Sequence, residues 1–181
     1  MRKIILLLLV SIVFVQCEKE NNFTLGRGQV GKITSATQVY ELKSIFENDS
    51  LVAHLGEGDF ADSAYDEYLV YTKQNKHALT IIPKEQHDST STIESIQIFD
   101  KKYKTSKGLG LGSIFKDIVE NYTVNKVEST FTTAVLFVDE LDVTITIAKK
   151  ELGINDFGTQ KISVAQIPDL AKIKTFTVWF D

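Results

Sequence analysis

The chain has 181 residues, of which 43% are hydrophobic and 24% charged, an ordinary composition for a globular protein. This length supports one domain with its own core and is short for two. The formal net charge of −4 excludes nucleic-acid binding through a general basic field, and a content of only two prolines excludes a proline-rich linker.

The N-terminus has the pattern of a signal peptide. A basic start, Met1-Arg2-Lys3, precedes an apolar run at residues 4–15 that only Ser11 interrupts. A helix over that run would span about 18 Å, well short of the ~30 Å hydrocarbon core of a membrane. Because a polar sequence follows at once, the pattern indicates a signal peptide, with a buried core helix as the alternative.

Cys17 directly follows the apolar run and is the single cysteine, so no internal disulfide is possible. The segment Phe14-Val15-Gln16-Cys17 resembles the lipobox of bacterial lipoproteins, and its Phe14 and Gln16 make it similar to the relaxed boxes of Bacteroidota-type lipoproteins. That resemblance implies cleavage by signal peptidase II before Cys17 and acylation of its thiol, with palmitate or a similar chain. Cys17 is therefore the expected lipidation site.

The resemblance also implies a cellular location and a division of the chain into three segments. We expect a signal peptide at residues 1–16, a lipidated cysteine and tether at 17–28, and a single domain at 29–181. Cleavage removes Arg2 and Lys3, which leaves 18 basic and 24 acidic residues and a net charge of −6. Acyl chains rather than electrostatic attraction would then hold the protein to the cell envelope, on the periplasmic or surface side of the outer membrane. In such lipoproteins an acidic stretch after the cysteine, here Glu18-Lys19-Glu20, marks export to the surface.

Two amphipathic helices are expected along the mature chain. At residues 37–48, Val39, Leu42, Ile45 and Phe46 share one face at a 3.6-residue period. At 113–121 a matching face recurs, formed by Phe115, Ile118, Val119 and Tyr122.

Short alternating runs between and after these helices predict strands joined as hairpins. The expected strands cover residues 51–55, 67–73, 77–82, 93–99, 124–128, 131–138, 143–148 and 173–180. The last strand carries apolar residues on both faces and should be central in its sheet. We therefore expect an α+β fold, with a curved antiparallel sheet and both helices on one face.

Two stretches share a layout of glycines, helix and hairpin. Val39-x-x-Leu42-x-x-x-Phe46 and Phe115-x-x-Ile118-x-x-x-Tyr122 are related by a period of 76 residues, which favours a duplicated helix-plus-sheet unit or a chance likeness of two meanders. With the glycine-rich turn at residues 107–112, this layout resembles small uncharacterised envelope lipoproteins and is similar to β-lactamase-inhibitor-like lipoprotein domains, over residues 28–180. The resemblance implies proteins that mostly bind other proteins or have no assigned activity.

Two glycine motifs are candidates for phosphate-binding turns. Gly26-Arg27-Gly28-Gln29-Val30-Gly31 matches G-x-G-x-x-G, but it follows the expected tether instead of a buried strand, so a plain loop is favoured. The turn from Gly108 to Gly112 lacks the Lys-Ser/Thr ending of a P-loop, and a tight turn is the favoured use.

Few other residues point to chemistry. His54, His77 and His87 have no second histidine or cysteine at ligand spacing, so no metal or cofactor is expected. No nucleophile elbow is present, and an acylated Cys17 could not act as a nucleophile. An acidic cluster lacks the spacing of a calcium loop and indicates a solvated loop; its members are Glu57, Asp59, Asp62, Asp66 and Glu67.

These patterns lead to one expected function and two alternatives. We expect a non-catalytic, membrane-anchored envelope lipoprotein that binds another protein. The first alternative is a lipoprotein that binds a glycan or small molecule with aromatic side chains near the acidic loop, drawn from Phe60, Tyr65, Tyr68, Tyr71 and Trp179. The second is a hydrolase whose carboxylates meet only in three dimensions.

Overall fold

The computed structural model describes residues 22–56, 65–154 and 158–180. Its main feature is an eight-stranded sheet in which every neighbouring pair is antiparallel. The strands, in chain order, are β4(Ser50–His54), β5(Glu67–Tyr71), β6(His77–Pro83), β7(Ile93–Ile98), β9(Lys126–Ser129), β10(Thr133–Val138), β11(Val143–Ala148) and β12(Ile173–Trp179). The expected α+β class and each expected strand of this sheet are confirmed.

The order of the strands divides the sheet into two matching halves. From edge to edge it runs β4-β5-β6-β7-β12-β11-β10-β9, so the first four strands appear in chain order and the last four in reverse. The halves meet where β12 pairs with β7, at Thr177 with Gln97, Val178 with Ile96 and Trp179 with Ser95. β12 therefore has a strand on each side, as its apolar residues on both faces predict.

Each half also carries one short helical segment. The first consists of a 3-10 turn, η1(Val39–Glu41), continued by α1(Leu42–Ile45), and the second is α2(Phe115–Asn121). Both are shorter than the expected helices at 37–48 and 113–121. The first begins at Val39 instead of Thr37, because the Thr37 hydroxyl accepts a hydrogen bond from the amide of Thr34 and so closes the preceding turn.

The residues just before the two helical segments make equivalent contacts in both halves. Gln38, just before η1, forms an isolated bridge with Thr92, and Ile114, just before α2, forms one with Lys172. Glu41 accepts a hydrogen bond from the amide of Gln38 at 2.7 Å, as Asp117 does from that of Ile114 at 2.9 Å. The expected period of 76 residues relates these helix positions, so the two halves share one layout.

A second, smaller sheet was not expected from the sequence. Its order is β3(Ile33–Thr34), β2(Gln29–Val30), β1(Thr24–Gly26), β8(Lys104–Thr105), and β1 pairs with β8 in parallel. Leu25 on β1 is 3% exposed, and Ile33 on β3 is fully buried. The expected tether at 17–28 is thus too long, because residues from Thr24 onward already belong to the fold.

The hydrophobic core lies between one face of the main sheet and the helices with the small sheet. Leu42 and Ile118 supply one fully buried side chain from each helix. From the sheet come buried residues of the six inner strands, including Leu79, Ile96, Leu136, Ile145, Phe176 and Val178, all at 0% exposure. The edge strands β4 and β9 add only the half-buried Leu51 and Val127. Burial of every second strand residue on one face is typical of an antiparallel sheet covered on that face alone.

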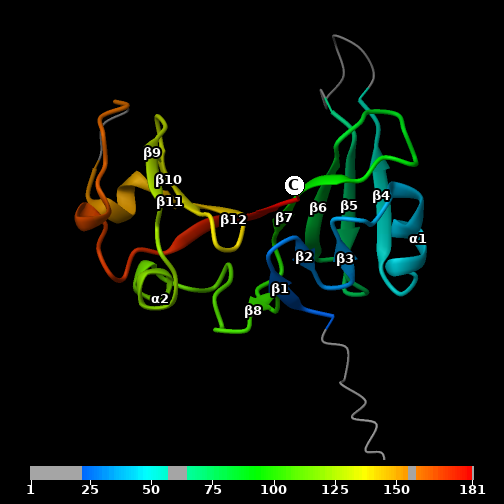
Figure 1. Ribbon diagram of the computed structural model, residues 1–181, viewed down its shortest axis with the longest axis horizontal. Coiled ribbons are helices and arrows are strands. Elements are labelled where there is room, and N and C mark those ends of the chain that lie inside the picture. Colours follow the sequence, from blue (N-terminus) through cyan, green and yellow to red (C-terminus); the bar gives the residue numbers. More distant parts are fainter. Residues whose placement is uncertain (1–21, 57–64, 155–157, 181) are drawn as a thin grey trace, which may run out of the picture.

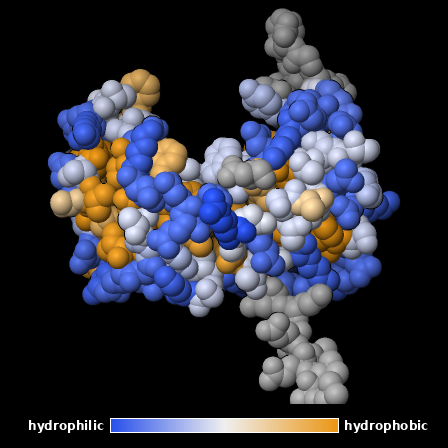
Figure 2. Space-filling view, viewed as in Figure 1, coloured by the Kyte–Doolittle hydropathy of each residue, from blue (hydrophilic) through white to orange (hydrophobic). Residues whose placement is uncertain are grey.

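The molecule has the shape of two lobes on either side of a hollow. Figure 1 shows β9–β11 with α2 in one lobe and β4–β6 with α1 in the other, joined by β7 and β12 near the C-terminus. The helices and the small sheet lie away from the hollow, and Figure 2 shows the same hollow in the molecular surface. The first described residues adjoin β1, on the side of the molecule opposite the hollow.

Candidate functional site

The face of the main sheet that the helices leave uncovered is the largest candidate site. The residues of this face, here called the open face, include one continuous row of paired residues that crosses all eight strands. The row consists of Val52, Leu69, Thr80, Gln97, Thr177, Thr144, Phe137 and Lys126. Seven of these eight side chains are uncharged, and seven are half-buried or exposed, since Thr80 alone among them is buried.

Aromatic side chains flank this row in both halves. In the first half the His77 ring stacks on Phe99 with centroids 4.0 Å apart and lies 5.2 Å from the Tyr71 ring. In the second half Trp179 is 40% exposed, and its indole Nε1 donates a hydrogen bond to the Thr144 hydroxyl at 3.0 Å. Half-exposed aromatic groups held in place by such contacts are typical of surfaces that bind a partner.

The dimensions of the open face match those of a protein interface. Eight strands at about 4.8 Å spacing span about 38 Å, and five residues along a strand span about 17 Å, for about 650 Å². A standard interface buries about 800 Å² on each partner, with an uncharged, aromatic centre. The open face has this composition, since the charged residue of its row, Lys126, stands on the edge strand β9.

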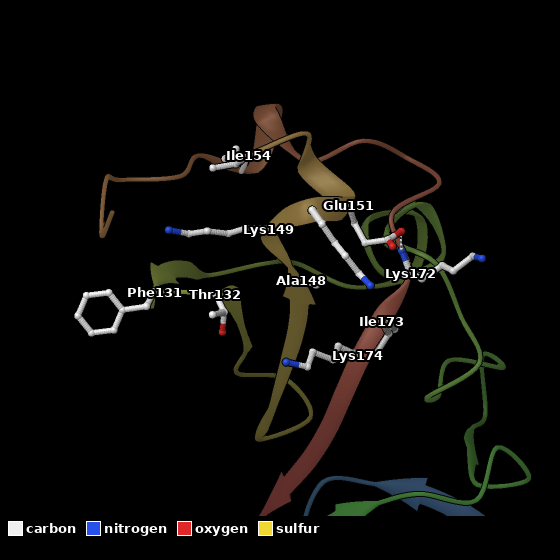
Figure 3. Close-up of a pocket in the computed structure, with 10 residues that line it drawn as sticks. Phe131, Thr132, Ala148, Lys149, Glu151, Ile154, Lys172, Ile173 and Lys174 are labelled. Carbon is white, nitrogen blue, oxygen red and sulfur yellow. Dashed lines mark hydrogen bonds between the residues drawn. The ribbon is translucent and has the colours of Figure 1, made fainter. Parts of the chain in front are cut away.

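A second candidate is a cavity of about 510 Å³ at one end of β11 and β12. We call it the lysine pocket. Its lining residues are Phe131, Thr132, Ala148, Lys149, Lys150, Glu151, Ile154, Lys172, Ile173 and Lys174 (Figure 3). Four lysines and one glutamate give the lining a formal charge of +3, whereas the whole chain carries −4.

The lysine pocket forms where the two halves of the molecule differ most. Residues 84–92 connect β6 to β7 in the first half, whereas the longer stretch 149–172 connects β11 to β12 in the second. This stretch begins with the 3-10 turn η3(Lys149–Leu152) and later includes η4(Val164–Gln166). The turn folds back over the strand ends because the amide of Lys149 donates to Thr132 and that of Ile154 to Lys149.

Lys149 and Glu151 act mainly in holding this segment together. Lys149 is 2% exposed, and its ammonium donates a hydrogen bond to the carbonyl oxygen of Gly158. Glu151 accepts a hydrogen bond from the amide of Lys172 at 3.2 Å, drawn as a dashed line in Figure 3. Hydrogen bonds within the 149–172 segment therefore fix the pocket walls.

The expectation of a solvated acidic loop is wrong for Asp66. This carboxylate is 1% exposed and accepts hydrogen bonds from the amides of Gly56 at 3.0 Å and His87 at 2.6 Å. Burial, and then the nearby Asp66 carboxylate, raise the pKa of the Tyr68 hydroxyl above its usual value. Glu67 is half-buried on β5, while Glu57, Asp59, Phe60 and Asp62 lie outside the described residues.

The three histidines do not come together. His54 ends the edge strand β4 and is exposed, and His77 lies on the open face with its Nε2 3.0 Å from the hydroxyl of Thr80. His87 has a φ of 57° and its Nδ1 lies 3.7 Å from the Asp66 carboxylate. Among the described residues, no three His, Cys, Asp or Glu side chains are grouped as metal ligands.

Both glycine motifs form tight turns. Gly31 follows the β1–β2 hairpin with a φ of 56°, and a Cβ there would lie 2.5 Å from the carbonyl oxygen of Asn22. A Cβ on Gly110 would clash with the carbonyl oxygen of Tyr103. These close backbone approaches explain both glycines. The turn at Gly108 to Gly112 is the use favoured from the sequence, whereas the first motif belongs to the β1–β2 hairpin and is not a plain loop.

The remaining predicted residues are divided between surface and sheet. Tyr65 is 62% exposed, Tyr71 and Trp179 belong to the open face, and Tyr68 packs against the core. Cys17 lies outside the described residues, so its lipidation stays a prediction. Within the described ranges, no helix is long and apolar enough to cross a membrane.

The lysine pocket was missed in the sequence analysis. Its charges come from Lys149-Lys150 on one side and Lys172-x-Lys174 on the other, more than twenty residues apart. Two lysine pairs that flank one connecting segment are a weak signal, which becomes a site only when β11 and β12 pair.

Comparisons with known proteins give a fold and no activity. No family model matches the chain, and no curated protein matches it. The chain is similar to the uncharacterised protein yfeY from Escherichia coli, whose crystal structure aligns with a TM-score of 0.50 and 14% identity, over 88% of this chain and 99% of that one. At this identity the likeness concerns the fold alone. Neither that neighbour nor the described side chains indicate a catalytic activity.

Proposed function

We propose that the protein is a lipid-anchored protein of the cell envelope that binds a protein partner on the open face and catalyses no reaction. The observation that carries the proposal is the uncharged row across seven strands, from Val52 on β4 to Phe137 on β10, with aromatic groups beside it. Binding surfaces of this composition gain free energy from burial of aromatic and β-branched side chains without the cost of burying charge.

The position of the N-terminus supports the anchored arrangement. The described chain starts near β1, on the side opposite the hollow, and Cys17 precedes Asn22 by five residues. A lipid on Cys17 would therefore hold the protein with its open face turned away from the membrane. A partner in the surrounding compartment would have free access to that face.

A protein partner fits the open face better than a second copy or a glycan. The sheet bends between β7 and β12, so the open face lines a hollow, and two such hollows placed face to face would leave space between them. A glycan usually requires polar groups gathered around an aromatic ring, whereas the row here offers mainly threonine and apolar side chains. A convex protein surface is the complement of this shape.

Site-specific photocrosslinking in the native envelope tests the proposal. A photoreactive phenylalanine analogue is placed at Gln97 or Thr177 on the open face, and at Lys43 or Glu120 on the helices as matched controls. We expect the open-face positions alone to form an adduct with one protein, which purified partner reproduces and excess unlabelled chain competes away. Adducts from all four positions, an adduct of twice the chain mass, an adduct removed by glycosidases, or no adduct from either face would each contradict the proposal.

A further inference from the structure

We propose that the lysine pocket binds a small organic anion, a carboxylate or phosphate attached to an apolar body. This inference is independent of the partner on the open face, because it is carried by a different surface at the 149–172 segment. The pocket joins two properties in one cavity: a positive lining in an acidic protein, and an apolar wall.

Ion pairs among the described residues do not balance the positive charge of the pocket. Among the described residues, no ion pair joins Lys150, Lys172 or Lys174 to a carboxylate, although ion pairs occur elsewhere, as between Lys126 and Glu128. Glu151, the one acidic residue among the described lining residues, already accepts a hydrogen bond from the Lys172 amide. Ammonium groups gathered around a cavity repel each other, and a bound anion relieves that repulsion.

The side chains are arranged so that an anion can meet more than one of them. Figure 3 shows Lys174 reaching from β12 across toward Ala148 on β11, while Lys149 extends along the opposite wall under Ile154. The Lys172 ammonium points away from the others, so Lys172 adds to the field more than to direct contact. Lys150 is exposed and borders the same cavity, which makes Lys150 and Lys174 the expected anion contacts.

The apolar wall determines the other part of the ligand. Phe131 is 67% exposed, one of the most exposed large apolar side chains among the described residues, and it lines the same cavity as Ala148, Ile154 and Ile173. An apolar group seated there would remove Phe131 from water, which is favourable in proportion to the area buried. A volume of about 510 Å³ suits a small organic molecule.

Calorimetric titration of the full chain carrying Cys17→Ser tests this inference with a matched pair of probes. Octanoate and octanamide have the same apolar body, and only octanoate is charged. We expect octanoate to bind one to one, at least about tenfold more tightly than octanamide, and to weaken as salt is added. Equal affinity for the two probes, or no binding of octanoate, would overturn the proposal.

Three variants locate the binding. Lys150→Gln and Lys174→Gln should each weaken octanoate about five- to tenfold and leave octanamide unchanged. Lys43→Gln, an exposed change on α1 that removes the same charge, should have no effect. Both pocket lysines are exposed, so thermal unfolding should show that all three variants remain folded. If Lys43→Gln lowers the affinity for octanoate as much as the pocket variants do, the cause is the net charge of the protein, and the proposed anion site is contradicted.

A soluble short-chain phosphatidylglycerol separates the two sources of such an anion. Binding of this lipid in competition with octanoate, sensitive to Lys174→Gln, would identify a membrane phospholipid as the occupant. Octanoate binding that the lipid does not displace would identify a free organic acid. Either result supports the anion site, and the photocrosslinking outcome on the open face does not depend on it.

Discussion

The amide of Val39 donates a hydrogen bond to the carbonyl oxygen of Ser91 across 3.0 Å, which ties the start of η1 to the residues that lead into the central strand β7. The second half repeats this contact, with Phe115 donating to Ala171 at 2.9 Å. Each helix is thus attached to the sheet through its first turn as well as through its buried face. The two halves therefore attach their helices to the sheet in the same way. Equivalent substitutions in the two halves should change the free energy of unfolding by similar amounts.

The helix caps provide the most direct comparison of the halves. Glu41→Ala and Asp117→Ala each leave one amide at a helix start without its carboxylate partner, and each should lower the free energy of unfolding by about 1 kcal/mol. Glu120→Ala on α2 removes only an exposed pair with Lys116 and should cost less than about 0.5 kcal/mol. Chemical denaturation measures all three. If only one of Glu41→Ala and Asp117→Ala lowers the free energy of unfolding, the two halves resemble each other in structure but not in stability.

Asp66 should matter for stability despite its place in an acidic stretch. Asp66→Asn keeps the size of the side chain but replaces one carboxylate oxygen with an NH₂ group. That group would face the backbone N–H of Gly56 or His87, so two hydrogen-bond donors would meet without an acceptor. Because a buried donor without a partner is costly, we expect a loss of about 1–3 kcal/mol in unfolding experiments. Glu67→Gln, the neighbouring half-buried carboxylate, is the control and should be nearly neutral. Equal effects of the two changes would contradict the role given to Asp66.

Tyr103 should make the protein sensitive to alkaline pH. Burial, with smaller contributions from Asp100 and Asp49, raises the pKa of its hydroxyl far above the ordinary value of 10.0. The unfolded chain then loses the phenolic proton at about pH 10 while the folded chain keeps it, so stability is complete below that pH and falls above it. We expect Tyr103→Phe to flatten the decline in melting temperature between pH 9 and 11, whereas the exposed Tyr40→Phe should follow the wild type.

Trp179 is the single tryptophan and stands on the open face, so its fluorescence reports on binding there. When the partner found by crosslinking is added, we expect emission to shift to shorter wavelength and quenching by acrylamide to fall several-fold, because a 40% exposed indole becomes covered. Octanoate should change neither signal, since the lysine pocket does not include Trp179. Unchanged quenching on partner binding would place the partner elsewhere.

The main sheet was predictable because its strands alternate strongly. Val143, Ile145 and Ile147 point to the core while Thr144 and Thr146 do not, and the observed β11 has the expected bounds. The helix positions followed from the spacing of Leu42 and Ile118 in the same way. The first helix was predicted too long because Phe46 packs against the core from beyond the helix end. The second ends at Asn121 as predicted but begins only at Phe115.

The small sheet and the lysine pocket were not predictable for a different reason. Strands of two or three residues, such as β2 and β8, are too short to show a period, and Leu25 alone gives no pattern. Lys150 and Lys174 come together only through pairing between β11 and β12, which neither local sequence contains. Asp66 was misassigned because a carboxylate buried by backbone amides looks the same in sequence as a solvated one.

Detergent partitioning and intact mass of the protein expressed in a bacterial host test the central claim, that the chain works from a membrane through a lipid on Cys17. The wild type should enter the detergent phase with a chain that starts at Cys17 and carries acyl mass, whereas Cys17→Ser should stay in the aqueous phase without it. If both proteins are aqueous and unacylated, the anchor is wrong, and the open face must be explained without a membrane.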